Sequence, residues 1–246
     1  GCQMNEADSE YIVGTLEALG WTPVASEEDA ELVLFNTCVV RQGAEDRALA
    51  RVDRLKSLKT MFPSKKIGIC GCLAQQDGHA LIDERPYLDL VLGTRALPQL
   101  PTLLAELEKS GTPQVCADLD GDPYDIAFSP KRKQGLVGRV NIIAGCNKNC
   151  SYCIVPTTRG RELSRSAATI ICEVRELAAQ GHKEILLIGQ NVNSYQDNGT
   201  GLAQLLAKVN AIDGVERIRF VTSHPRDANE DMFQAMATLP KVCESL

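Results

Sequence analysis

The stretch Leu136–Cys153, which reads LVGRVNIIAGCNKNCSYC, decides the fold of this chain. Its first part, Leu136–Ala144, is an apolar run of strand type, and a glycine and three cysteines at CxxxCxxC spacing follow it. Thiolates are the soft ligands that iron–sulfur clusters require. Three thiols can hold three irons of a cubane cluster and leave the fourth iron without a protein ligand. Because an open coordination position is typical of catalytic metal sites, we predict a reactive 4Fe-4S cluster on Cys146, Cys150 and Cys153.

A structural zinc site is the alternative for the same cysteines. Such a site needs a fourth ligand close by in the sequence. The nearest downstream candidates are Cys172 and His182, and neither lies at a usual ligand spacing. The spacing therefore favours the open cluster.

The composition is that of an ordinary globular protein. The chain has 246 residues, of which 44% are apolar and 24% charged, and this length is sufficient for two modest domains. No stretch reaches membrane-spanning length, and the opening residues are not those of a signal peptide. Ten cysteines would suit a secreted disulfide scaffold, but such scaffolds are small and cysteine-dense. We therefore expect a monomer in a reducing cytoplasm, with no membrane association.

Positive charge is concentrated in one part of an acidic chain. The net charge is −6, but residues 131–165 carry +7, which leaves −13 for the rest. The basic residues of this strip are Lys131, Arg132, Lys133, Arg139, Lys148, Arg159, Arg161 and Arg165, against the single acid Glu162. The strip could meet nucleic-acid phosphates or form a solvated linker face, and charge alone does not decide between them.

Strand-like runs alternate with helical patterns on both sides of a polar break. In the first half the expected strands are Glu31–Asn36, Lys66–Ile69 and Leu88–Gly93, and the expected helices are Asp8–Leu19, Gly43–Met61 and Leu100–Lys109. In the second half the expected strands are Leu136–Ala144, Glu184–Ile188 and Glu216–Val221, and the expected helices are Ala167–Gln180, Gly201–Ile212 and Asp227–Thr238. This alternation predicts an α/β protein with parallel sheets, and three βα units are too few to close a barrel.

The polar break is rich in turn formers and charges and holds two prolines, so it is expected to be a linker. We therefore expect an amino-terminal domain over residues 1–117, a linker over 118–135 and a second domain over 136–246.

Three further cysteines share a position in the first domain. Cys38 and Cys72 each follow a strand, and Cys2 directly precedes the first helix, where an earlier strand would end. Because the carboxyl ends of parallel strands meet at one edge of a sheet, we expect these thiols to converge as a second metal site. The alternative is three unrelated thiols packed as small apolar groups, the role expected for Cys70, Cys116, Cys172 and Cys243.

The CxxxCxxC motif after the first strand of a βα barrel resembles the radical S-adenosylmethionine (SAM) superfamily. Further segments resemble both domains of the methylthiotransferase family and are similar to it over nearly the whole chain. In the first domain they are GCQMNEADSE (1–10), NTCVVRQGAEDRA (36–48) and GCLAQ (71–75). In the second they are VNIIAGCNKNCSYCIVPTTRGRELSR (140–165), LLIGQNVNSY (186–195) and RIRFVTSHPRD (217–227). Within the family they most resemble the branch called MiaB, which modifies tRNA.

The resemblance implies a fold, cofactors and a reaction. It implies an amino-terminal parallel-sheet methylthiotransferase domain followed by part of a radical SAM (βα) barrel. Cys2, Cys38 and Cys72 would hold an auxiliary 4Fe-4S cluster, and one SAM molecule would methylate a sulfur on it. A second SAM would be cleaved at the CxxxCxxC cluster, whose open iron binds its amino and carboxylate groups. The resulting radical would remove the hydrogen from C2 of N6-isopentenyladenosine, beside the tRNA anticodon. The methylthio group would then transfer to that carbon. A protein such as flavodoxin or ferredoxin would supply the electron that reduces the CxxxCxxC cluster.

Other site residues follow from the same resemblance. Tyr152 corresponds to a position near the SAM adenine, and Gln190 and Asn191 end the second barrel strand, where the superfamily contacts the SAM amino group. Strand-end capping is the alternative for these two amides. Ser223 and His224 end the third strand on the catalytic side and are candidates to contact SAM or substrate.

Three arginines of the basic strip are also candidates. Arg159, Arg161 and Arg165 are expected to reach the SAM carboxylate or tRNA phosphate, since guanidinium groups suit both, with a solvated surface as the alternative.

The chain departs from the family at both ends. It begins at the first cluster cysteine, stops after the third barrel unit and lacks the carboxy-terminal TRAM domain that helps the family bind tRNA. We therefore expect a fragment that is inactive alone. The alternatives are a methylthiotransferase for threonylcarbamoyl-adenosine tRNA or a ribosomal protein, a two-cluster electron carrier, and a zinc-stabilised RNA-binding module.

Overall fold

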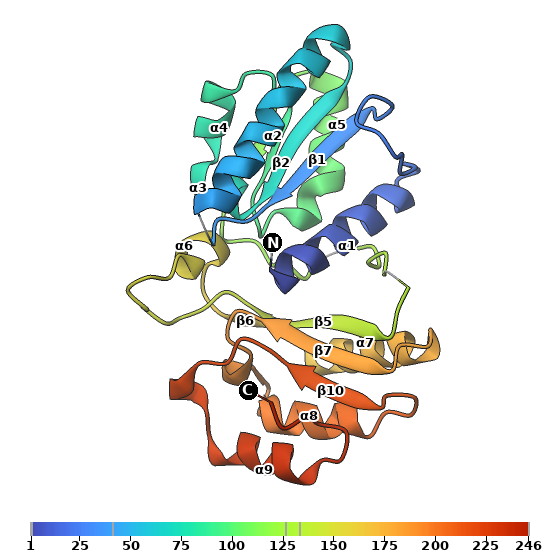
Figure 1. The fold of residues 1–246 in the computed structure, drawn as a ribbon, viewed down its shortest axis with the longest axis vertical. Helices are drawn as coiled ribbons and strands as arrows, with labels where there is room; N and C mark the ends of the chain where they lie inside the picture. The colour runs from blue at the N-terminus through green and yellow to red at the C-terminus, as the bar shows by residue number, and fades with distance from the viewer. Residues whose placement is uncertain (1, 41, 126, 133, 246) are drawn as a thin grey trace. The chain divides into compact units, whose positions relative to one another are not determined.

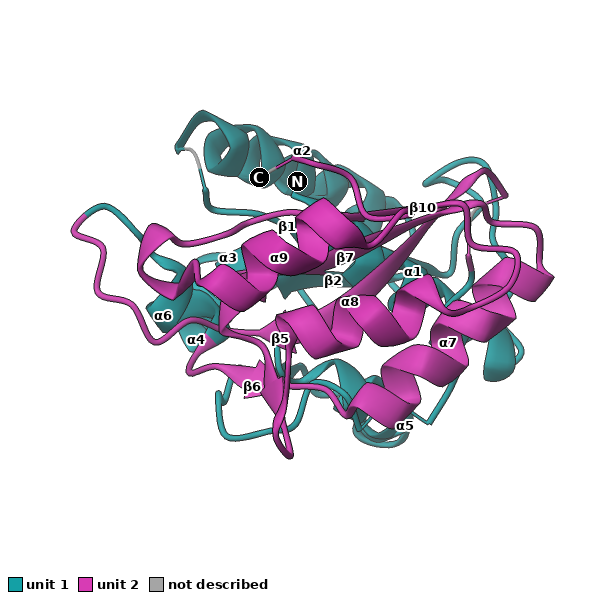
Figure 2. Ribbon diagram, turned by 90° about the horizontal axis from the view of Figure 1, so that it is seen from below, with its two compact units in different colours: residues 1–131, 152–159 teal, residues 132–151, 160–246 magenta. Residues whose placement is uncertain are grey.

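The computed structural model describes residues 2–40, 42–125, 127–132 and 134–245, which form the elements drawn in Figure 1. These residues divide into two compact units, coloured separately in Figure 2. The amino-terminal unit comprises Gly1–Lys131 and Tyr152–Arg159, and the carboxy-terminal unit comprises Arg132–Ser151 and Gly160–Leu246. A single boundary in the sequence cannot express this division, because the chain returns to the amino-terminal unit at Tyr152.

The amino-terminal unit is built on a four-stranded parallel sheet in the order β1-β2-β3-β4. The strands are β1 (Leu32–Thr37), β2 (Lys66–Gly71), β3 (Leu90–Leu92) and β4 (Gln114–Cys116). The predicted parallel sheet is confirmed. Strand β4 is missing from the expected elements because its three residues are too few to show a period.

Helices cover both faces of this sheet. They are α1 (Gln3–Ala18), α2 (Gln42–Met61), α3 (Cys72–Asp77), α4 (His79–Glu84) and α5 (Leu100–Ser110), with the short helices η1 (Leu97–Gln99) and α6 (Val155–Arg159). Leu90 and Leu92 pack in the cluster of α1 and α5, whereas Val91 between them packs in the cluster of α2, α3 and α4. This alternation along one strand is what separates the two apolar cores.

The carboxy-terminal unit is an open sheet in the order β10-β7-β5-β6. Its strands are β5 (Val137–Ala144), β6 (Leu163–Ser164), β7 (Glu184–Gly189) and β10 (Arg217–Phe220), of which β6 alone runs antiparallel to its neighbour. Helices α7 (Ala167–Ala179), α8 (Leu202–Asn210) and α9 (Glu230–Thr238) bury their apolar sides with the sheet in one core. A two-stranded ribbon of β8 (Gln196–Asp197) and β9 (Thr200–Gly201) and the turns η2 (Val192–Ser194) and η3 (Pro225–Asp227) complete the unit. The predicted part-barrel is confirmed.

Two helices begin away from their expected positions, each for a local reason. Helix α1 starts at Gln3, because Met4 and Ala7 are also buried and extend its apolar side toward the amino end. Helix α9 starts at Glu230, because the Asn229 side chain accepts a hydrogen bond from the amide of Met232 at 2.9 Å and caps the helix there.

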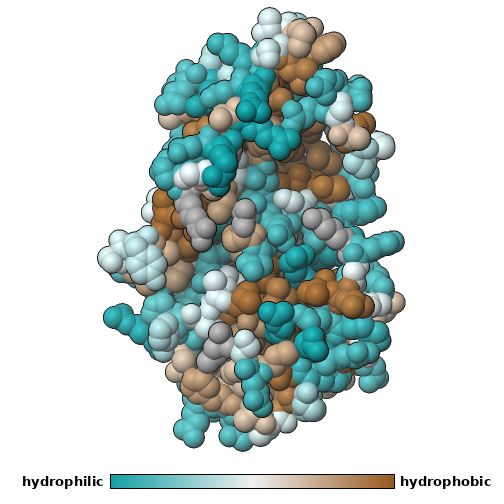
Figure 3. Space-filling view, in the orientation of Figure 1, coloured by the Kyte–Doolittle hydropathy of each residue, from teal (hydrophilic) through white to brown (hydrophobic). Residues whose placement is uncertain are grey.

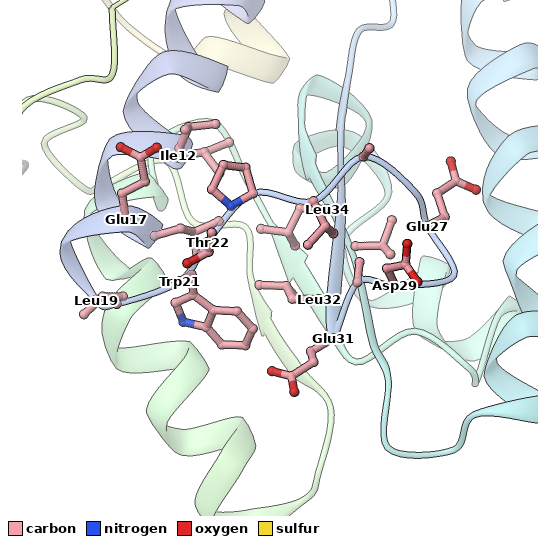
Figure 4. Close-up of a pocket in the computed structure, with 18 of the residues that line it drawn as sticks. Ile12, Glu17, Leu19, Trp21, Thr22, Glu27, Asp29, Glu31, Leu32 and Leu34 are labelled. Carbon is pink, nitrogen blue, oxygen red and sulfur yellow. The ribbon is translucent and has the colours of Figure 1, made fainter.

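A pocket of about 880 Å³ lies beside β1, the edge strand of the amino-terminal sheet (Figure 4). Leu32 and Leu34 of β1 line it together with Trp21 and residues of α1. Val13, which also lines it, is partly exposed, and Figure 3 shows hydrophobic surface in this region of α1 and β1. The lining includes no cysteine, histidine, lysine or arginine.

Among the described helices, none has both the length and the apolar character needed to cross a bilayer.

Candidate metal centres

Cys2, Cys38 and Cys72 lie on neighbouring elements of the amino-terminal unit. Cys2 caps α1, Cys38 follows β1, and Cys72 is the first residue of α3 directly after β2. The Cys2 thiol donates a hydrogen bond to Cys38, which lowers the pKa of Cys38 to about 6 and raises the pKa of Cys2. The negative charge of Cys72 also acts on Cys38 and opposes this lowering. Cys38 therefore interacts with both of the other thiols.

A network of amide side chains fixes the first of these thiols beside the sheet. Asn5 of α1 donates to the Asn36 side chain at 2.6 Å and to the carbonyl of Thr37 at 3.1 Å. Asn36 donates back to the Asn5 carbonyl at 2.7 Å and to Ser9 at 2.9 Å. Because Asn5 lies in the first turn of α1, this exchange ties the turn that carries Cys2 to the end of β1.

Gly71 allows Cys72 to approach the same point. Its φ is +90°, a conformation that favours glycine, and a Cβ there would lie 2.5 Å from both the Asn36 side-chain oxygen and the Thr37 carbonyl. A larger residue would separate β2 from the end of β1. The glycine therefore keeps Cys72 close to the strand end that carries Cys38.

A buried arginine lies beside this triplet. Arg159, at the end of α6, is 5% exposed, and its guanidinium pairs with Asp8 of α1 at 2.6 Å. Burial alone would lower the pKa of Arg159, but the charges of Asp8, Cys72 and Cys2 outweigh it and raise the pKa. The structure thus gives Arg159 a buried partner within the amino-terminal unit, so the alternative of a solvated surface role is wrong for this residue.

The segment that carries Arg159 is held by main-chain contacts. Thr94 donates to the carbonyl of Thr158 at 2.6 Å, and Arg95 donates to the carbonyl of Arg159 at 3.0 Å. Helix α6 also packs against α3, which begins with Cys72. Cys153 belongs to this segment and is half-buried.

In the carboxy-terminal unit, the loop that carries Cys146 and Cys150 leaves β5 through a second special glycine. Gly145 has φ +78°, and a Cβ on it would overlap the carbonyl of Arg161 and lie 2.5 Å from that of Gly160. The Gly145 amide donates to the Gln190 side chain at 2.6 Å, and the Cys146 amide donates to the Gly160 carbonyl at 3.0 Å. Gln190 therefore acts here as a support for the cysteine loop.

Two carboxylates hold the middle of the same loop. Glu162 accepts from the Asn147 amide at 3.2 Å, and Asp227 pairs with Lys148 at 2.7 Å. The Asn191 amide nitrogen joins both, at 3.2 Å from Glu162 and 2.7 Å from Asp227. Burial alone would raise the pKa of Asp227, but the hydrogen bonds from Lys148 and Asn191 outweigh it and lower the pKa. The loop is thus tied to residues that follow β7 and β10.

Asn191 also presents an acceptor that the protein leaves unused. The residue is 1% exposed, and its side-chain oxygen is buried without a hydrogen-bond partner in the described structure. A buried acceptor without a donor costs free energy, so a ligand ammonium or hydroxyl would be favoured at this position. The residue fits the contact to the SAM amino group that the sequence led us to expect.

His224 lies against the second loop cysteine. Its Nε2 is 3.5 Å from the Cys150 sulfur, and its Nδ1 accepts a hydrogen bond from the Arg226 amide at 3.2 Å. An Nδ1 that accepts leaves the proton of the neutral ring on Nε2, which therefore points at the sulfur. This places His224 at the cysteine loop, whereas Ser223 beside it is exposed.

Other predicted site residues are more scattered. Tyr152 is 89% exposed and lies in the part of the chain that belongs to the amino-terminal unit. Among the described residues, carboxylate partners are seen for several bases of the strip, namely Lys131, Arg132, Lys148, Arg159 and Arg165. Lys133 lies outside the described residues. Much of the positive charge of the strip is therefore paired with carboxylates of the protein itself, which disfavours its interpretation as a free phosphate-binding surface.

The zinc alternative finds little support in the placement of its proposed ligands. His182 precedes β7 and so lies at the amino end of the sheet, opposite the cysteine loop that follows β5. Cys172 is exposed on α7, and the expectation that it is a buried thiol is wrong. Within the described ranges, no three His, Cys, Asp or Glu side chains gather as ligands of one ion. A cubane instead binds each thiolate to a different iron.

Glu162, Lys148, Asp227 and Asp8 were not predicted as site residues. Lys148 lies inside the cysteine motif, and Glu162 is the only acid of the basic strip, so both could have been singled out. Nothing in the sequence pairs Asp8 or Asp227 with its partner, because those contacts depend on the fold.

The comparisons with known proteins follow the same division. Residues 1–93 match the model of the uncharacterized protein family UPF0004, and residues 140–243 match that of the radical SAM superfamily. A tRNA-2-methylthio-N(6)-dimethylallyladenosine synthase of Caldicellulosiruptor saccharolyticus is 45% identical over all of this chain and 53% of its own length. One from Syntrophotalea carbinolica is 44% identical over all of this chain and 57% of its own length. The chain thus spans about half the length of these curated relatives.

A solved structure shares the fold. The radical SAM methyltransferase TsrM from Kitasatospora setae, with tryptophan and a SAM analogue bound, matches with a TM-score of 0.57 at 14% identity. The match covers 98% of this chain and 50% of that one. Along its entire length the chain is therefore similar to tRNA-2-methylthio-N(6)-dimethylallyladenosine synthases, with a UPF0004 region followed by a radical SAM region.

Proposed function

We propose that this chain is the cluster-bearing part of an enzyme that adds a methylthio group to C2 of N6-isopentenyladenosine beside the anticodon of tRNA. Its cofactors would be SAM and two 4Fe-4S clusters, and its partners tRNA and a reducing protein such as flavodoxin or ferredoxin. The proposed compartment is a reducing cytoplasm, in keeping with ten cysteines that are all free thiols.

The observation that carries this proposal is the presence of two cysteine triplets on one chain. One triplet, Cys2, Cys38 and Cys72, interacts within the amino-terminal unit, and the other has the CxxxCxxC spacing of the radical SAM superfamily. In the part of the chain that the structure describes, neither triplet has an evident fourth thiol, whereas electron-carrier clusters are closed by four cysteines. Relatives named for this tRNA reaction support the choice of substrate.

The chain's own residues have distinct tasks in this proposal. Cys146, Cys150 and Cys153 bind the cluster that, once loaded and reduced, supplies radical chemistry with SAM. The unused Asn191 oxygen would accept a hydrogen bond from the SAM ammonium, and Glu162 and Asp227 hold that amide in place. His224 would donate from Nε2 to the Cys150 sulfur and so orient it. Cys2, Cys38 and Cys72 bind the second cluster.

Metal analysis of the full-length protein tests the two-cluster part. After anaerobic reconstitution we expect about eight irons per chain, falling to about four in Cys146→Ala and in Cys38→Ala. Zinc near two per chain without iron would refute the clusters. An unchanged cluster spectrum on addition of SAM would instead favour an electron carrier.

Mass spectrometry of tRNA nucleosides tests the substrate. A deletion strain should lack the methylthio-isopentenyl nucleoside, and the wild-type gene should restore it whereas the Cys146→Ala gene should not. Persistence of that nucleoside in the deletion strain would refute the proposed reaction. Loss of the threonylcarbamoyl counterpart instead would assign the chain to a related methylthiotransferase.

A further inference from the structure

The contacts of Arg159 place a fixed positive charge at the Cys2, Cys38 and Cys72 triplet, although its sequence position is in the segment that follows CxxxCxxC. We propose that Arg159 and its partner Asp8 are positioning residues that set the reduction potential of the cluster held by that triplet. This inference rests on the proposed function, because it requires the second cluster to exist.

The pair is costly enough to need a reason. The side chains of Arg159 and Asp8 are 6% and 8% exposed, and their charged atoms are 2.6 Å apart. Removing two charges from water costs free energy that their attraction barely repays, so such a pair is weak evidence for stability. Arg159 is also shielded from solvent-borne phosphate at this exposure, which disfavours the role of a tRNA contact.

Arg159 is held both at its guanidinium and at its main chain. Asp8 lies on α1, the helix that begins directly after Cys2, and the Arg159 carbonyl accepts from Arg95 at 3.0 Å. Helix α6, which ends at Arg159, packs against α3, and α3 begins at Cys72. Two of the three cysteines are therefore on elements that contact Arg159 or its partner, so its charge cannot move far from the triplet.

The charge acts on the thiols. Cys2 and Cys72 both lie close enough to Arg159 to interact with its charge. Asp8 has the opposite sign and acts on the neighbouring buried thiol Cys70. The two partners therefore bias the same region in opposite directions.

The consequence follows from charge alone. Reduction adds one electron, supplied by the protein donor, to a cluster already bound by three anionic thiolates, and no bond is made or broken. The reduced cluster is more negative, so a nearby cation favours it and a nearby anion disfavours it. Net charge around an iron–sulfur cluster is one of the factors that set its potential. Arg159 should raise the potential, and Asp8 should lower it.

The test measures the potential of the second cluster alone. In the full-length protein, the three CxxxCxxC cysteines are replaced by alanine, and the remaining cluster is titrated with EPR detection. Arg159→Gln should make reduction about tenfold less favourable, which is a fall of about 59 mV for one electron. Asp8→Asn should raise the potential by a similar amount, and the double variant should lie near wild type.

Controls separate electrostatics from damage to the fold. Arg159→Lys keeps the charge and should keep the potential, and Arg54→Gln removes an exposed charge on α2 and should change nothing. If Arg159→Gln does not fold, Asp8→Asn and Arg159→Lys still decide the inference. Iron retained at about four per chain with no shift, or shifts of the same sign in both single variants, would overturn it. Absence of iron from the parent protein would instead show that the proposed second cluster is wrong.

Discussion

Replacement of Gly145 by alanine is the most direct test of how the cysteine loop is built. Gly145 has φ +78°, and a residue with a Cβ loses about 1–2 kcal/mol in this conformation. The added Cβ would also overlap the carbonyl oxygens of Arg161 and Gly160, and crowding of this kind costs about 1–3 kcal/mol more. The free energy of unfolding should therefore fall by about 2–5 kcal/mol unless the loop moves.

Gly199 provides a matched control in the same unit. Its φ is +83°, but no atom lies within 4 Å of a Cβ built on it, so Gly199→Ala has the backbone cost without the crowding. We expect Gly199→Ala to lose only about 1–2 kcal/mol. The comparison therefore isolates the close approach of Gly145 to residues 160 and 161.

Two measurements follow the effect. The thermal midpoint of the apo-protein should fall by about 2–4 °C for each kcal/mol lost, and further for Gly145→Ala than for Gly199→Ala. The reconstituted full-length protein should lose iron only in Gly145→Ala, because a shifted loop carries Cys146 away from its position. Equal midpoints and equal iron contents in the two variants would refute this account of the loop.

Three other changes probe separate contacts. Lys148→Met removes the ion pair between the cysteine loop and Asp227 and should speed the loss of iron to a chelator. Lys183→Met removes an exposed ion pair and should not change that rate. Equal rates in the two variants would show that the Lys148 ion pair does not hold the loop. Asp89→Ala leaves half-buried Lys59 without its carboxylate at 2.7 Å and the Ile67 amide without its acceptor, which should cost about 1–3 kcal/mol in denaturant unfolding. No measurable loss would contradict this. Burial alone would raise the pKa of Asp53, but hydrogen bonds from a neighbouring tyrosine and arginine outweigh it and lower the pKa. The stabilisation by ionised Asp53 is present above about pH 3.9 and is lost as the pH falls further. The thermal unfolding midpoint of Asp53→Asn should therefore lie below that of wild type at pH 7 and approach it in acid. A difference that stays constant with pH would contradict this.

Local patterns in the sequence predicted much of the fold. Short apolar runs separated by helical periods indicated parallel sheets in both units, and these are confirmed. Strands β4 and β6 were not predicted, because two or three residues are too few to show the alternation of apolar and polar residues that indicates a strand. The start of α9 was misplaced because a side-chain cap at Asn229 decides it.

The cysteine spacing was readable from the sequence, and so was the proximity of Cys38 and Cys72 to one sheet edge, because parallel strands bring their carboxyl ends together there. Only the tertiary structure showed that Arg159 pairs with Asp8, 151 residues away, and that Asn191 joins the two carboxylates of the cysteine loop. A charge count treats each base of the strip alike, whereas folding pairs several of them with acids from distant segments. The physical reason is that periodicity reports which face of an element is buried, but the partner of a buried charge depends on which elements pack together.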